Sequence, residues 1–163
     1  MQKKLVLISP TSQRLVELFG LDKGYSVSIL DFDLHAPDGT LELADRFGLK
    51  VASLHENPKN KRSYVHNRGR FDENNGNILN IPLDDGIQMQ EYLNLFSNGI
   101  RHCRESEVII VSAGFDISPL DRHSRLGLDE TIFIELGRMF SDIPQKKIFL
   151  LEGGYYPPTK LAG

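Results

Sequence analysis

The sequence has few residues that would cross-link the chain or anchor it in a membrane. Its 163 residues include one cysteine, Cys103, so no internal disulfide can form, and this usage fits a reducing, cytoplasmic compartment. No apolar run approaches the ~20 residues of a membrane span, and the apolar stretch after Lys4 is too short for a signal peptide. We therefore expect a cytoplasmic protein with no membrane association.

Charge and composition exclude a further class of function. The 19 Lys and Arg residues are outnumbered by 22 Asp and Glu residues, which gives a net charge of −3 and argues against a nucleic-acid-binding surface as the main function. Hydrophobic residues make up 40% and charged residues 25% of the chain, as in ordinary globular proteins. Without an internal repeat or a linker, we interpret residues 1–163 as a single domain with no direct nucleic-acid partner.

Short apolar runs alternate with segments of helical periodicity along the chain. We predict strands over residues 5–8, 26–32, 49–54, 77–83, 108–111 and 147–151. Helices are predicted between Thr11 and Gly20 and over residues 41–47, 89–103 and 129–141, the last capped by Asp129. This order is typical of an α/β three-layer sandwich with a mostly parallel sheet. The polar stretch 56–76 is predicted to be a long loop, either solvated or, through its Lys and Arg residues, a patch for an acidic ligand.

The stretch from Ile29 to Thr40 carries the most informative side chains. Asp31, Asp33 and His35 alternate with apolar residues, so on a strand all three would point to one side. A buried carboxylate without a partner is costly or takes up a proton, and a cation removes that cost. Asp and His are ordinary ligands of zinc and other first-row divalent metals. The pattern therefore predicts a metal site, although an Asp-rich strand end that faces water would look the same.

Polar residues also follow two other predicted strands. Asp116 comes shortly after strand 108–111, and Tyr155 comes shortly after strand 147–151. In parallel α/β sheets, sites form in the crevice beyond the carboxyl ends of the strands. We therefore expect Asp116 and Tyr155 at the same rim as Asp33 and His35.

Three stretches, in this order and spacing, resemble one family, the zinc-dependent deacetylases. These comprise the histone deacetylases, the acetylpolyamine amidohydrolases and the acetoin-utilisation proteins. Residues 31–40, DFDLHAPDGT, are similar to the family's D-x-D-x-H-H-x-D-G-T segment. Residues 112–116, SAGFD, and residues 152–155, EGGY, are similar to two more of its motifs. Weaker support comes from residues 53–55, SLH, and 80–83, NIPL.

The resemblance implies an arginase/deacetylase-like fold and a catalytic zinc site. It makes Asp33, His35 and Asp116 the zinc ligands, with other divalent metals as alternatives. Three protein ligands would leave the metal an open position for water and the substrate carbonyl. Tyr155 would donate its hydroxyl to the developing oxyanion.

The same resemblance implies a second ion and a substrate class. Asp31, Ser53 and Leu54 would line the family's structural site for a monovalent cation such as K⁺. The implied reaction is hydrolysis of the acetyl-amide bond of acetyl-lysine or an acetylpolyamine.

Two departures from the family pattern change this expectation. The family carries adjacent histidines upstream of the metal strand, which act as general base and acid, but no histidine precedes Asp31 here. Family members are also typically about twice this length, so the sequence resembles only their C-terminal portion, a truncated domain. In addition to these two departures, Ala36 stands where the family often has a second histidine. A separately encoded N-terminal half, or a homo-oligomer, is therefore an expected partner.

Several alternatives remain open. A non-catalytic or degenerate metal-binding remnant would keep the ligands without acid–base catalysis, which typically contributes about 10²–10⁴-fold. Asp31 and Asp33 after an apolar strand would also suit a haloacid dehalogenase-type phosphatase, but that reading leaves the SAGFD and EGGY motifs unexplained.

Three histidines predicted to lie in or beside loops could replace the family's catalytic histidines: His55, His66 and His123. His123 is the first candidate for the general base. The other interpretation of each histidine is a solvated or loop-bracing role. Arg122 and Arg125 are expected either to meet an acidic group of the substrate or to brace their loop. Cys103 lies on an apolar helical stripe and is predicted to be structural.

Overall fold

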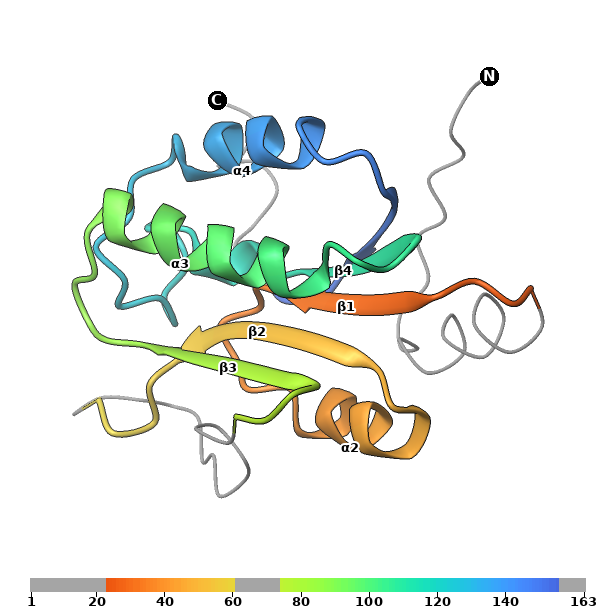
Figure 1. Cartoon of the computed structure of the whole chain (residues 1–163). Coiled ribbons are helices and arrows are strands. Elements are labelled where there is room, and N and C mark those ends of the chain that lie inside the picture. The colour runs from red at the N-terminus through yellow and green to blue at the C-terminus, as the bar shows by residue number, and fades with distance from the viewer. Residues whose placement is uncertain (1–22, 61–73, 156–163) are drawn as a thin grey trace.

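The structure, a computed structural model, describes residues 23–60 and 74–155. Five parallel strands form one sheet in the order β3-β2-β1-β4-β5 (Figure 1). The strands are β1 (Val27–Asp31), β2 (Lys50–Glu56), β3 (Ile78–Leu83), β4 (Val108–Ala113) and β5 (Lys146–Leu151). The helices are α2 (Asp38–Phe47), α3 (Met89–Cys103), the short 3-10 turn η2 (Phe115–Ile117) and α4 (Ile132–Ser141).

Helices cover the sheet on both faces, so the predicted α/β sandwich is confirmed. Figure 1 shows α3 and α4 on one side of the strands and α2 on the other. Each face has its own apolar cluster: Phe32, Leu54, Phe96 and Phe140 belong to the cluster under α3 and α4. The predicted strand 5–8, the predicted helix up to Gly20 and most of the loop 56–76, including His66, lie outside the described residues.

The direction of the chain across the sheet reverses beside β1. From β1 the chain moves outward to β2 and β3, and then returns to place β4 on the opposite side of β1. Asp31 at the end of β1 is the register partner of Ser53 on β2 and of Ser112 on β4. Such a switch point leaves a crevice beyond the carboxyl ends of the strands, where ligands of open α/β sheets bind.

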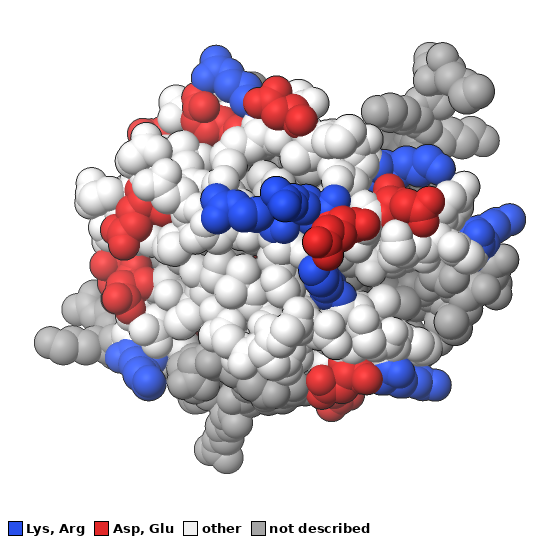
Figure 2. Space-filling view, in the orientation of Figure 1, with Lys and Arg blue, Asp and Glu red and all other residues white. Residues whose placement is uncertain are grey.

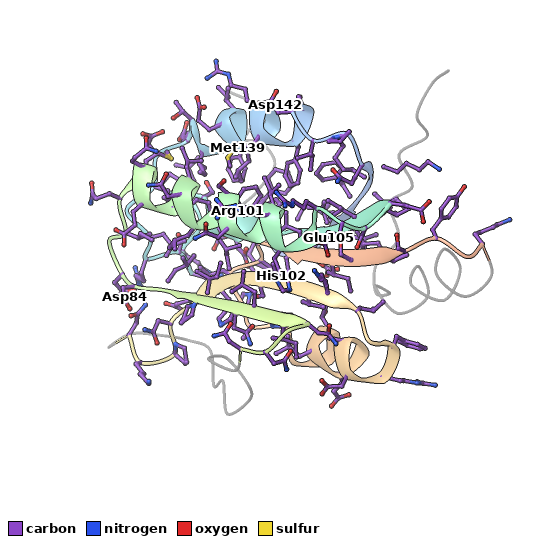
Figure 3. All side chains as sticks on the ribbon, viewed as in Figure 1. Asp84, Arg101, His102, Glu105, Met139 and Asp142 are labelled. Atoms are coloured by element: carbon purple, nitrogen blue, oxygen red, sulfur yellow. The ribbon has the colours of Figure 1, made fainter. Side chains whose placement is uncertain are left out.

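Strands β1 and β4 are fully buried, as expected for parallel strands covered on both faces. Helix α3 packs closely on β1 and β2: a Cβ atom added to Gly99 would lie 2.9 Å from Leu30 Cδ1 and 3.3 Å from Leu54 Cδ1. Cys103 is buried at the end of the same helix, and its thiol donates to the Ile29 carbonyl at 3.4 Å. The thiol is therefore a packing residue, as the apolar stripe predicts. His102 joins α3 to the chain before β3 (Figure 3), because its Nε2 lies 2.9 Å from the Asn77 carbonyl oxygen.

Several element boundaries differ from the prediction. Helix α4 begins at Ile132 with Thr131 as its N-cap, whereas Asp129 accepts a hydrogen bond from the Thr131 amide at 2.8 Å and so braces the turn before the helix. Helix α2 begins at Asp38, three residues before the predicted start. Strand β2 continues to Glu56, so His55 is a fully buried strand residue, and the prediction that it lies in or beside a loop is wrong.

Charges of both signs share the face seen in Figure 2. Lys and Arg side chains gather near the middle of this face, with Asp and Glu side chains beside them and toward its edges. Arg101 lies in the last turn of α3, and Glu105 follows just beyond the end of that helix (Figure 3). Glu105 accepts from Lys50 Nζ at 2.8 Å. This face therefore has no continuous basic surface. None of the described helices has the length and apolar character needed to cross a membrane.

Candidate metal centre

The three predicted ligands meet at the switch point of the sheet. Asp33 and His35 lie on the turn after β1, and Asp116 lies in η2, directly after β4. Each offers one ligand atom, and these atoms all lie within 4.8 Å of one another. Their convergence follows from the parallel pairing of β1 with β4, which brings the two strand ends side by side.

His35 is the centre of this group. Its Nδ1 atom lies 2.8 Å from Asp33 Oδ1 and 3.0 Å from Asp116 Oδ2. The remaining carboxylate oxygens are held by backbone amides: Gly153 donates to Asp33 Oδ2 at 2.7 Å, and Leu34 donates to Asp116 Oδ1 at 3.1 Å. Each carboxylate is thus fixed on one side by the backbone and directs its other oxygen at the imidazole.

The electrostatics of the group favour a cation. Asp116 and then Asp33 raise the pKa of His35 to about 10, against the opposing effect of partial burial. Burial raises the pKa of Asp116. Burial also acts to raise the pKa of Asp33, but hydrogen bonds from His35 and from the Gly153 amide outweigh it and lower that pKa. Without a metal, a proton on His35 neutralises part of the negative charge.

The donor set fits a divalent ion. Asp116 is fully buried, and among the described residues no donor meets its Oδ2 atom in hydrogen-bonding geometry, although His35 Nδ1 is close. A buried carboxylate oxygen in that state is costly, and a metal bound by Asp33, His35 and Asp116 would satisfy it. Two carboxylates with one imidazole are suitable ligands for zinc.

Glycine is required where the strand-end segments approach the ligands. A Cβ atom on Gly153 would lie 2.2 Å from Asp116 Oδ2 and 2.5 Å from Asp33 Oδ2. A Cβ atom on Gly114 would lie 2.4 Å from Asp33 Cα. These glycines let the chain after β4 and the chain after β5 close on the two carboxylates.

The residues predicted to line a monovalent-cation site lie on β1 and β2, next to the turn that carries Asp33 and His35. Asp31 is buried, and its Oδ1 accepts from the Asp33 amide at 2.9 Å. Burial, and then the charge of Asp33, raise the pKa of Asp31 well above its usual range. Ser53, its register partner, has its hydroxyl 2.9 Å from His55 Nδ1, and Leu54 follows with a buried side chain. A cation at this position stays a prediction.

Tyr155 lies beside the ligands and is open to solvent. Its ring centroid is 6.1 Å from that of His35, edge to face, and 57% of the residue is exposed. Burial of part of the ring, followed by the charges of Asp33 and Asp116, raises the pKa of its hydroxyl. A cavity of about 470 Å³ lies in front, lined by His35, Tyr155, Glu152 and other residues of the rim.

A second carboxylate–imidazole pair adjoins the site. Asp121 Oδ1 lies 3.0 Å from His123 Nδ1, and Asp121 Oδ2 accepts from the Tyr155 amide at 2.8 Å. The His123 ring centroid is 5.0 Å from that of Tyr155 and 6.5 Å from that of His35. The sequence suggested His123 as a substitute base, but Asp121 was missed, because its role depends on a backbone amide 34 residues away.

Comparisons with known proteins point to one family. The family model described as "Histone deacetylase domain" matches residues 15–162. Acetylpolyamine amidohydrolase 2 of Pseudomonas aeruginosa is 28% identical over 144 residues, which cover 83% of this chain and 41% of that protein. The acetylpolyamine amidohydrolase of Mycoplana ramosa is 28% identical over 147 residues, which cover 85% of this chain and 42% of that protein.

Solved structures show the same likeness. The crystal structure of an HDAC homolog complexed with SAHA superposes with a TM-score of 0.73 at 25% identity and covers 88% of this chain and 41% of that one. The acetylpolyamine aminohydrolase of Burkholderia pseudomallei gives a TM-score of 0.70 at 22% identity, which shows the fold alone. The chain spans about two fifths of the length of these relatives, and it belongs to the histone deacetylase family.

Proposed function

We propose that this chain supplies the metal-binding part of a zinc-dependent deacetylase that hydrolyses acetyl-amide bonds. The observation that carries the proposal is the convergence of Asp33, His35 and Asp116 at the switch point, in a chain of this family. Relatives named as acetylpolyamine amidohydrolases and histone deacetylases support an acetylpolyamine or acetyl-lysine as the substrate.

The residues have separate roles in this reaction. Asp33, His35 and Asp116 would hold Zn²⁺ or another divalent ion, which when bound supplies a Lewis acid that polarises the acyl carbonyl. Tyr155 would donate its hydroxyl to the oxygen that becomes negative. The raised pKa of Tyr155 keeps that hydroxyl protonated at neutral pH, and its exposure leaves it accessible to a substrate.

A structural monovalent cation such as K⁺ would lie at the second predicted site. Asp31, Ser53 and Leu54 would line it, and the cation would offset the burial of the Asp31 carboxylate, whose pKa is raised by that burial. In this arrangement the second ion stabilises the turn after β1, because the same Asp31 carboxylate holds the Asp33 amide.

This chain lacks the pair of adjacent histidines that act as general base and acid in the family. No two of its five histidines are adjacent in the sequence. We propose that residues 1–163 form one partial domain, which works in the cytoplasm with a polypeptide that supplies the remainder, encoded separately or on the same chain, or with a second copy. The alternative is a metal-binding remnant that keeps the ligands without turnover. A haloacid dehalogenase-type phosphatase is not supported, because it gives no role to Asp116 or Tyr155 beside Asp33.

Assays on acetylated substrates test the proposed reaction. An acetyl-lysine fluorogenic substrate and an acetylpolyamine are incubated with zinc-loaded chain alone and with the N-terminal part of Pseudomonas aeruginosa acetylpolyamine amidohydrolase 2. We expect very weak or no turnover alone and turnover on addition of the second polypeptide. That turnover should fall at least about 100-fold in Tyr155→Phe, because one oxyanion donor is typically worth that much.

The control variant and the other outcomes distinguish three possibilities: an enzyme that needs a second polypeptide, a non-catalytic remnant, and a chain that is active alone. Tyr25→Phe removes a tyrosine hydroxyl on another part of the chain and should leave turnover unchanged. Zinc binding without turnover in any combination would favour the remnant. Robust turnover by the chain alone would contradict the need for a second polypeptide and would make His123 the first candidate for the base, to be tested by His123→Ala.

A further inference from the structure

Residues 152–155, here called the strap, lead from the end of β5 to the metal centre. The Gly153 carbonyl accepts from the Phe115 amide at 2.9 Å, and the Gly153 amide donates to Asp33 Oδ2 at 2.7 Å. Both backbone polar groups of Gly153 are therefore fixed. Because Asp33 is one of the predicted metal ligands, the first half of the strap is tied directly to the metal centre.

Gly154 separates this fixed position from Tyr155. Its φ of +134° lies in a region that residues with side chains rarely adopt, and glycine has more backbone freedom than any other residue. The backbone alone therefore does not fix the direction in which Tyr155 leaves the strap. A contact beyond Gly154 fixes it: Asp121 Oδ2 accepts from the Tyr155 amide at 2.8 Å.

The side chain of Tyr155 has little packing of its own. The residue is 57% exposed, whereas a buried core residue typically contacts roughly 6–12 others. The Tyr155 ring meets two imidazoles edge to face, with centroid distances of 6.1 Å to His35 and 5.0 Å to His123. The position of the ring therefore depends on how firmly these histidines are held.

Asp121 also holds the nearer of the two histidines. Its Oδ1 atom accepts from the His123 amide at 2.9 Å and lies 3.0 Å from His123 Nδ1. The Asp121 amide donates to the Ser118 carbonyl at 3.0 Å, and the residue is buried. One buried and braced carboxylate thus contacts both the backbone of Tyr155 and the histidine beside its ring.

Small displacements of a hydrogen-bond donor matter in a hydrolysis of this kind. A donor stabilises an oxyanion when it lies about 2.7–3.1 Å from the position of that oxygen, and a misplacement of about 1 Å can cost roughly 100-fold in rate. A tyrosine that turned about Gly154 would leave this range. The hydroxyl therefore needs a hold outside the strap itself.

We propose that Asp121 positions the Tyr155 hydroxyl beside the metal ligands, by holding the Tyr155 amide directly and the Tyr155 ring through His123. In this role Asp121 acts through Tyr155 and does not contact the reacting atoms. The inference deepens the proposed function and rests on it, because the position of Tyr155 matters to the reaction only if its hydroxyl is the oxyanion donor.

Ring contacts of Tyr155 in the metal-free 163-residue chain test the hold itself. Nuclear Overhauser effects between the Tyr155 and His35 ring protons are expected in the wild type, and Asp121→Ala should abolish them. Ser124→Ala is the matched control, because it removes a hydroxyl that donates to the Ile117 carbonyl at 3.2 Å in the same loop, and it should keep them. If Asp121→Ala does not fold, Asp121→Asn replaces it, because whichever way its amide turns it loses the contact to Tyr155 or to His123.

A double-mutant cycle on the zinc-loaded chain tests the consequence for a ligand. Acetohydroxamate is the probe, since it presents a carbonyl to the metal as the substrate would. Tyr155→Phe should weaken its binding at least about 10-fold, because a hydrogen bond to a charged group is lost. The Asp121 variant should weaken binding in the presence of Tyr155 but by less than about 2-fold in the Tyr155→Phe background, since the two changes remove one interaction.

The outcomes separate positioning from a general structural role. Zinc affinity of the Asp121 variant should stay at the wild-type value, because Asp116 keeps its own hydrogen bond from the Leu34 amide. Ring contacts that persist in the Asp121 variant would overturn the proposal, as would equal loss of acetohydroxamate binding with and without Tyr155→Phe, or a loss of zinc affinity as large as the loss of acetohydroxamate affinity. Loss of the ring contacts in a chain that binds no zinc would uphold the hold on Tyr155 and contradict the proposed function.

Discussion

Asp121 shows how much of the site one buried carboxylate can organise. Its two oxygens meet the imidazole of His123 and the backbone amide of Tyr155, so one side chain positions two neighbours of the metal ligands. Asp33, His35 and Asp116 could be predicted from their positions after strands, because the carboxyl ends of parallel strands share a rim. Asp121 could not, since its role depends on chain segments that meet only in the folded molecule.

Replacement of Asp121 by Asn tests this role. Asparagine has one acceptor oxygen and one NH₂ group, so a buried donor would face either the Tyr155 amide or His123. An unsatisfied buried donor costs about 1–3 kcal/mol, and we expect urea unfolding to shift to lower concentration by a corresponding amount. Asp142→Asn, an exposed residue at the end of α4 (Figure 3), is the control. An unchanged midpoint for Asp121→Asn would contradict the account.

Helices and strands could be predicted where the pattern of apolar residues extends over most of the element. The apolar stripe of α3 and the strands β1 and β4 were assigned correctly, because tertiary packing and the local pattern of apolar residues agree there. The ends of elements were less predictable. His55 lies on β2 because pairing with β3 continues to Glu56, and pairing across a sheet leaves no mark in the local sequence.

The position of Cys103 on α3 leads to a prediction at this scale. Burial raises the pKa of its thiol to about 11, so at pH 8 the thiolate fraction is about 100-fold lower than for a thiol of ordinary pKa. We expect iodoacetamide to alkylate the native protein at least about 100-fold more slowly than the urea-unfolded protein, with a rate that rises with pH. Similar rates in both states would show that α3 does not hold Cys103 in the core.

Among the described residues, β5 forms one edge of the sheet. The central strands are buried, whereas β5 pairs only with β4 and ends in apolar residues that are partly exposed, with Leu151 49% exposed. Exposed apolar edges promote association of chains, so the isolated protein should self-associate as its concentration rises.

Light scattering on two lysine variants checks this. Leu151→Lys places a charge on the β5 edge and should shift self-association to at least several-fold higher concentration, because edge lysines oppose strand pairing. Ile134→Lys changes an equally apolar, 57% exposed residue on α4 and should have little effect. A wild-type chain that stays monodisperse at all concentrations would contradict the prediction.

Zinc binding by the purified chain is the measurement that tests the account most directly. Elemental analysis and competition titration should show about one zinc per chain, with an affinity reduced by more than about 100-fold in Asp116→Ala, because loss of even an outer partner of a ligand costs 10–100-fold. Asp142→Ala, an acidic residue outside the site, should bind zinc like the wild type. Absence of zinc after reconstitution, or equal binding by Asp116→Ala, would contradict the assignment of Asp33, His35 and Asp116 as a metal centre.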